Sequence, residues 1–84
     1  MDNRTKWMSV QLRAVAEGTV QEDSGEKLRA EGRLMAICNL LETFPKDWIS
    51  GPGALNILGQ LMLMEAAFPT YKEILKPAID ALNK

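Results

Sequence analysis

The segment from Ala54 to Phe68 constrains the fold most, because it reads as a helix that is apolar on two sides. Eleven of its fifteen residues are apolar. On a helical wheel, at about 100° per residue, one apolar stripe consists of Ile57, Leu61, Met64 and Phe68. A second stripe lies roughly 140° away and consists of Leu55, Leu58, Met62 and Ala66. One stripe can line a core, so the second predicts a further surface that covers it.

The size of the chain limits how far a single core can cover both stripes. Its 84 residues make one helical domain, 1–84. A domain of this size buries only about 60–65% of the surface that its unfolded chain exposes. Yet 46% of the residues are apolar. A small core beside a nearly all-apolar helix favours burial between chains, in a homo-oligomer or by docking on a larger protein assembly.

Charge and composition exclude several classes of function. Ten basic and eleven acidic residues give a net charge of −1, without the basic excess that is typical of nucleic-acid-binding proteins. The chain has no histidine, which is the commonest general base and metal ligand. Cys38, the only cysteine, lies in an apolar segment and reads as a small buried hydrophobe. We therefore expect a protein that is not an enzyme, with no catalytic residue, cofactor or metal site.

No segment is suited to a membrane. Residues 1–11 lack the apolar run of a signal peptide. A spanning helix needs about 20 apolar residues, whereas the segment 54–68 is shorter and contains Glu65. We expect a soluble, cytoplasmic protein that makes no membrane contact.

Glycine and proline divide the chain into helices. A first helix is expected at about 5–17, ended by Gly18 in a left-handed cap. A second is secure by Glu26 and ends before Pro45, because a proline disfavours helical geometry in the preceding residue. Its start is left open between a capping box at 19–22 and a later start at Ser24. Its core positions recur at the spacing of a heptad seam and are Ala30, Leu34, Ile37, Leu41 and Phe44.

The second half of the chain is expected to contain a loop and two further helices. Residues 45–53 form a loop from which Trp48 and Ile49 fold down over the end of the core. Ser50 is a candidate N-cap for the apolar helix 54–68. A capping box at 70–73 starts a last helix, which should kink or restart at Pro77.

These patterns predict an all-α fold of three to four short helices. The N-terminal antiparallel hairpin packs on the strongly apolar third helix. The candidate core is Trp7, Val10, Leu34, Ile37, Leu41, Phe44, Trp48, Ile57, Leu61, Met64, Phe68 and Leu75. The candidate interface with another chain is Leu55, Leu58, Met62, Glu65 and Ala66.

Three polar features have both a functional and a structural interpretation. The acidic connection at Glu22, Asp23 and Glu26 lacks calcium-loop spacing and is better explained as the start of a helix. Residues 50–53 lack the lysine of a phosphate loop and read as a turn. Glu65 lies between the two apolar stripes, where it either pairs with a cation of another helix or chain or reaches to water.

The segment Leu28 to Pro45 resembles a pattern in small helical accessory proteins of tailed bacteriophages, in which a helix of the type LR-x-E-x-x-x-L-x-x-LL ends at a proline. The likeness covers less than a quarter of the chain and is carried by Leu28, Arg29, Glu31, Leu40, Leu41 and Pro45. It implies a phage structural or assembly accessory protein, with the virion as a location and no active residues.

The sequence thus predicts a non-catalytic helical interaction or oligomerisation module. The alternative is a small regulatory protein associated with nucleic acid, or with a nucleic-acid-binding partner, through Arg29, Arg33 and nearby lysines. Nucleic acid is the less favoured partner, because Glu26 and Glu31 lie among these cations.

Overall fold

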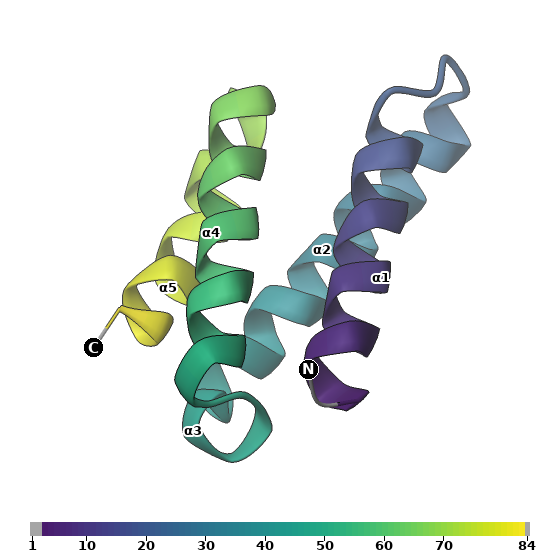
Figure 1. Cartoon of the computed structure of the whole chain (residues 1–84). Helices are drawn as coiled ribbons and strands as arrows, with labels where there is room; N and C mark the ends of the chain where they lie inside the picture. The colour runs from purple at the N-terminus through teal and green to yellow at the C-terminus, as the bar shows by residue number, and fades with distance from the viewer. Residues whose placement is uncertain (1–2, 84) are drawn as a thin grey trace.

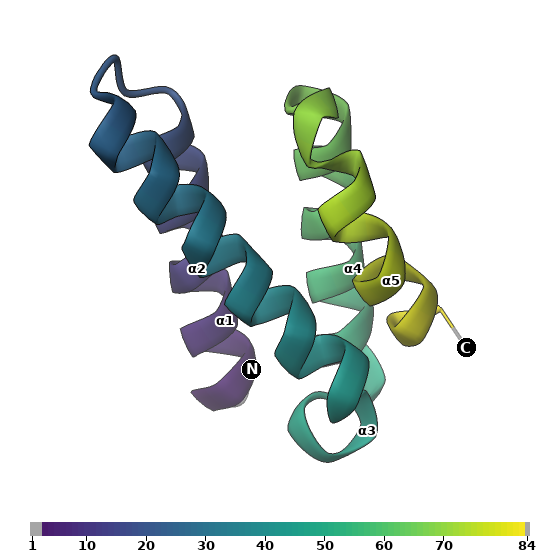
Figure 2. The ribbon, with the colours of Figure 1, turned by 180° about the vertical axis from the view of Figure 1, so that it is seen from behind.

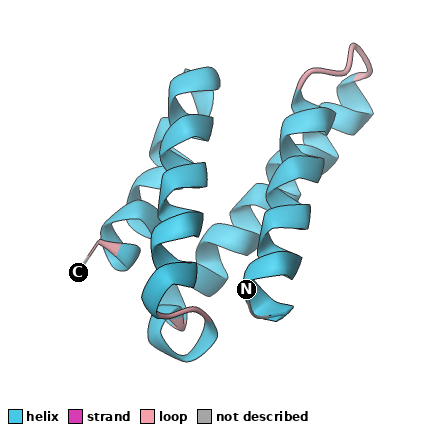
Figure 3. Cartoon of the chain, in the orientation of Figure 1, coloured by secondary structure: helices cyan, strands magenta, loops and turns pink. Residues whose placement is uncertain are grey.

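The computed structural model describes residues 3–83, which are almost entirely helical (Figures 1 and 3). Five α-helices and one 3-10 turn follow in the order α1 (Asn3–Thr19), α2 (Ser24–Thr43), α3 (Pro45–Trp48), α4 (Gly51–Ala67), η1 (Pro69–Tyr71) and α5 (Lys72–Leu82). The all-α class is therefore confirmed. The predicted loop at 45–53 contains an additional single turn of helix, α3.

The helices form two hairpins that lie side by side. α1 pairs with α2 and α4 pairs with α5. Seen from behind, α2 and α5 lie in front and carry the main contact between the hairpins (Figure 2). α1 and α4 make the second, less extensive contact on the opposite side (Figure 1). The sequence predicted that the hairpin packs on the apolar helix, and in the structure α4 contacts it through α1 while α5 contacts it through α2.

The core lies where the four long helices meet. The heptad positions of α2 (Leu34, Ile37 and Leu41), one stripe of α4 (Ile57, Leu61 and Met64) and Leu75 of α5 are buried. Ile49 is buried too, while Trp48 and Phe68 are half-buried and pack against the core. Ile49 and Trp48 thus cover one end of the core, as their apolar character in a loop predicts.

In α1 the predicted core row is wrong. Trp7 and Val10 are 42% and 55% exposed, whereas Met8 and Leu12, in the neighbouring row, are buried. The inward row begins at Thr5, which is buried against Gly53 of α4, and continues through Met8 and Leu12.

Trp7 instead belongs to an aromatic corner at the start of α1. Its ring lies 5.7 Å from that of Trp48 at an interplanar angle of 49°. The guanidinium of Arg4 lies 5.7 Å above the Trp48 ring and donates a hydrogen bond to the carbonyl of Asp47. These contacts tie α1 to α3 outside the core.

Phe44 is also on the surface, 46% exposed, although it continues the heptad spacing. It is the C-cap residue of α2, with φ −131° and ψ 43°. Because the backbone leaves helical geometry there, the side chain no longer follows the seam.

The structure tests the predicted helix ends at four places. Gly18 lies inside α1, with its Cα facing Ala30, and the only positive φ among residues 3–83 is that of Gly51, at 57°. α2 begins at Ser24 because the Asp23 carboxylate accepts hydrogen bonds from the amides of Gly25 (2.7 Å) and Glu26 (3.2 Å). Ser50 holds the N-cap position of α4, as predicted, but its side chain makes no cap hydrogen bond. The capping box predicted at 70–73 makes no side-chain cap hydrogen bond either.

The last helix differs from its prediction as well. α5 runs without interruption from Lys72 to Leu82 and does not restart at Pro77.

Thr19 has a different role from the predicted one. The capping-box pattern assigned its hydroxyl to the start of α2. In the structure this hydroxyl donates to the carbonyl of Val15 (2.7 Å) and lies 2.7 Å from the hydroxyl of Tyr71. This contact joins the end of α1 to η1.

Candidate functional site

The outer face of α4 is an apolar surface that no other described helix covers. Leu55, Met62 and Leu63 are 69%, 56% and 73% exposed, more large apolar side chains than any other helix leaves on the surface. The same face exposes three smaller residues, Pro52, Gly59 and Ala66. We call these six residues the α4 outer face. It contains no charged residue, and a contiguous apolar surface of this kind is typical of a contact with another protein.

The structure divides the predicted interface in two. Leu55, Met62 and Ala66 lie on the α4 outer face, while Leu58 and Glu65 are half-buried. On the helical wheel, Leu58 and Glu65 lie on the flank of α4 that points away from α1. They border the face and are not at its centre.

Sequence reasoning missed two residues of this face, Gly59 near its centre and Leu63 at the edge that adjoins the α1 side. Leu63, the most exposed large apolar side chain of the described chain, fell between the two stripes that were assigned. Gly59 was passed over because it has no side chain to bury. The spacing of Gly59 could have identified it, because Leu55, Gly59 and Leu63 follow each other at four-residue steps and therefore lie along one side of the helix.

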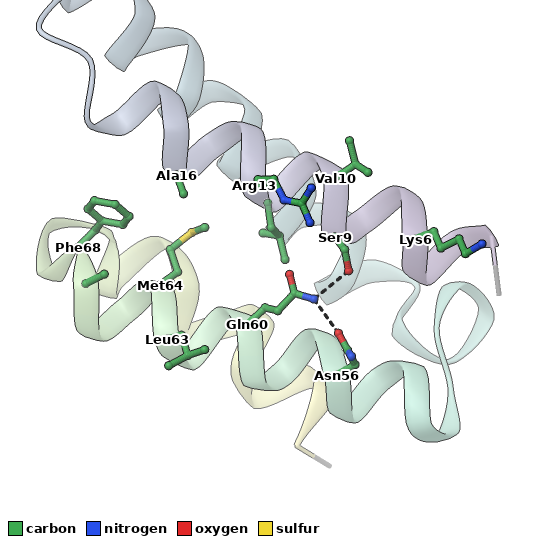
Figure 4. A pocket seen from close by; sticks show the side chains of 12 residues that line it. Lys6, Ser9, Val10, Arg13, Ala16, Asn56, Gln60, Leu63, Met64 and Phe68 are labelled. Atoms are coloured by element: carbon green, nitrogen blue, oxygen red, sulfur yellow. Dashed lines mark hydrogen bonds between the residues drawn. The ribbon is translucent and has the colours of Figure 1, made fainter. Parts of the chain in front are cut away.

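A groove between α1 and α4 adjoins the outer face. Its volume is about 680 Å³, and its apolar lining includes Val10, Leu12, Leu63 and Met64. Figure 4 shows Gln60 reaching across it, where its amide nitrogen donates to Ser9 Oγ (2.8 Å) and to Asn56 Oδ1 (2.6 Å). Leu63 therefore belongs to both surfaces.

Glu65 forms no ion pair within residues 3–83, where Arg29 and Glu26 make the only salt bridge. Its carboxylate is half-buried at the edge of the α4 outer face. Glu65 therefore pairs with no cation of another helix in this part of the protein. The predictions that it pairs with a cation of another chain, or that it reaches to water, stay predictions.

The two arginines of α2 make contacts within the chain. Arg29 pairs with Glu26, which raises the pKa of the guanidinium, first through the hydrogen bond and second through the charge of Glu26. Arg33 donates to Oε1 of Gln11 at 2.7 Å. This arrangement gives no support to a basic surface for nucleic acid.

Neither the cysteine nor the acidic residues form a chemically active cluster. Cys38 is buried, which raises the pKa of its thiol to about 12, and the charge of Glu42 adds to the effect. Asp23 caps α2. Within residues 3–83, no three cysteine or carboxylate side chains lie close enough together to hold a metal ion.

Comparisons with family models, curated proteins and solved structures gave no match to this chain. The resemblance of Leu28–Pro45 to small phage proteins therefore stays a prediction. In the part of the chain that the structure describes, no helix has the length and apolar character needed to cross a membrane.

Proposed function

We propose that this protein is a non-catalytic interaction module that binds another protein chain through the α4 outer face. The observation that carries the proposal is the exposure of Leu55, Met62 and Leu63 on one side of a single helix. Three large apolar side chains on one face lower the free energy when a partner covers them, because removal from water contributes about 1.5–3 kcal/mol for each fully buried side chain.

Two further features support this use of α4. The face lies on a continuous helix of 17 residues, which holds the side chains in fixed relative positions. Its centre is formed by small residues, Gly59 and Ala66, which let a partner helix approach closely. A phage assembly protein, as the resemblance of residues 28–45 implies, would use such a face to attach to a larger structure.

The test uses two methionines that differ only in location. Met62 on α4 and Met35 on α2 are 56% and 54% exposed. A photo-cross-linking amino acid is placed at one or the other position in the cells that produce the protein. We expect a discrete adduct with a protein chain from position 62, and none from position 35.

A second variant tests whether the adduct depends on the α4 outer face. Leu55→Glu places a charge on the α4 outer face and should abolish the adduct from position 62, because burying an unpaired carboxylate is costly. The proposal is refuted if position 62 yields no adduct, or if position 35 yields the same one.

A further inference from the structure

We infer that the partner of the α4 outer face is a second copy of this chain, whose α4 runs antiparallel to the first across a two-fold axis at Gly59. The inference rests on the proposed function and names the occupant of the surface. Its basis is the type of residue at equal spacing on either side of Gly59, with Leu55 matched by Leu63 and Pro52 by Ala66. The sixth residue of the face, Met62, is matched by the exposed Asn56.

This spacing is the same when read in either direction from Gly59. A two-fold axis requires a surface to match itself after reversal, because each residue i contacts j while j contacts i. With the axis at Gly59, residue 55 of one copy faces residue 63 of the other, which places leucine against leucine on both sides. Pro52 then faces Ala66 at both ends of the contact.

Gly59 permits the close approach that this arrangement needs. No heavy atom of another part of the chain lies within 4 Å of the position that a Cβ of Gly59 would occupy, so the space in front of it is open to a partner. The row formed by residues 55, 59 and 63 is inclined by about 26° to the helix axis, so two such rows become parallel when the helices cross at about 50°. This is the commonest packing class of helices.

The face itself presents no charge that would oppose self-association. None of its six residues is ionisable, so two copies meet without like charges in contact. The only bordering carboxylate, that of Glu65, lies on the flank away from the groove, outside the row through Gly59.

The buried thiol of Cys38 makes cysteine cross-linking a direct test, because an introduced cysteine is the only reactive one. In Gly59→Cys, two α4 helices near the wide end of the usual 8–10 Å separation place the facing Cα atoms about 5 Å apart, because each Cα lies about 2.3 Å from its helix axis, and this distance is within the range of a disulfide. We expect mild oxidation to link this variant into dimers. Met35→Cys, on the exposed side of α2, should stay monomeric.

Direction is tested with Leu55→Cys and Leu63→Cys. The antiparallel arrangement predicts a disulfide only when the two variants are mixed, since residue 55 of one copy lies about 12 Å along the helix from residue 55 of the other. A parallel pair would link each variant to itself, and that result would overturn the inference.

Sedimentation of the unmodified chain completes the experiment. We expect a concentration-dependent monomer–dimer equilibrium whose dissociation constant rises at least tenfold in Met62→Glu and is unchanged in Met35→Glu. Circular dichroism checks that every variant keeps its helical content. A folded monomer at the highest attainable concentration overturns the inference. The proposed function still stands in that case if position 62 forms an adduct with a different protein, and both fail if it forms none.

Discussion

Replacing Gly53 by alanine should destabilise the protein, although alanine is the better helix former. A Cβ at this position would lie less than 3.0 Å from Oγ1 of Thr5 and 3.5 Å from Cγ2 of Ile49. Thr5 is buried, so it has no free space into which it can withdraw. Overpacking of this kind costs about 1–3 kcal/mol. The gain in helix propensity, about 0.5–1 kcal/mol in a helix interior, is smaller because Gly53 lies in the first turn of α4.

Gly32→Ala is the matched control. Gly32 lies in the middle of α2, and no heavy atom is found within 4 Å of the position its Cβ would take. This substitution should stabilise the protein by about 0.5–1 kcal/mol. The two alanine variants should therefore differ by about 2–3 kcal/mol in the free energy of unfolding, in opposite directions from the parent.

Urea denaturation followed by circular dichroism measures this difference. The chain is kept dilute, because dimerisation would add its own concentration-dependent stability. A double-mutant cycle with Thr5→Ala then identifies the cause, since removing Oγ1 should relieve most of the cost of Gly53→Ala. If Gly53→Ala is as stable as Gly32→Ala, α4 does not approach α1 as closely as described.

Three further predictions follow from single contacts. Asp23→Ala removes the cap of α2 and should lower the free energy of unfolding by about 1 kcal/mol, whereas Glu22→Ala should leave it nearly unchanged; equal losses in urea denaturation would contradict the cap. The thiol of Cys38 has its pKa raised from 9.0 to about 12, so the unfolded chain loses this proton first and stability should fall as pH rises from about 9 to 12; Cys38→Ala should show a weaker loss over the same interval. Tyr71→Phe removes the hydroxyl contact with Thr19 and should cost about 0.5–1.5 kcal/mol, measured by the urea midpoint; an unchanged midpoint would show that η1 does not hold the end of α1.

Much of the architecture could be predicted from punctuation and periodicity. Pro45 marks the end of α2 and Ser50 the start of α4, and the heptad spacing of α2 identified Leu34, Ile37 and Leu41, which are buried. These features are local, so the sequence within one helix is enough to recognise them.

The parts that could not be predicted depend on contacts between helices. The rows of α1 that contain Trp7 and Met8 are both apolar, and which one faces inward depends on how α1 packs on α2 and α4. The same limit applies to the α4 outer face. Hydrophobicity identified Leu55 and Met62, while Gly59 and Leu63 are recognised only once the covered side of α4 is known.

The aromatic corner determines what optical spectroscopy can report about this protein. Both tryptophans, Trp7 and Trp48, lie there, where α1 meets α3. Neither belongs to the α4 outer face, so dimerisation should leave the tryptophan emission nearly unchanged. The signal follows the detachment of α1 from α3, whereas circular dichroism follows all five helices. A fluorescence midpoint that coincides with the circular dichroism midpoint would therefore show that the two hairpins unfold as one cooperative unit.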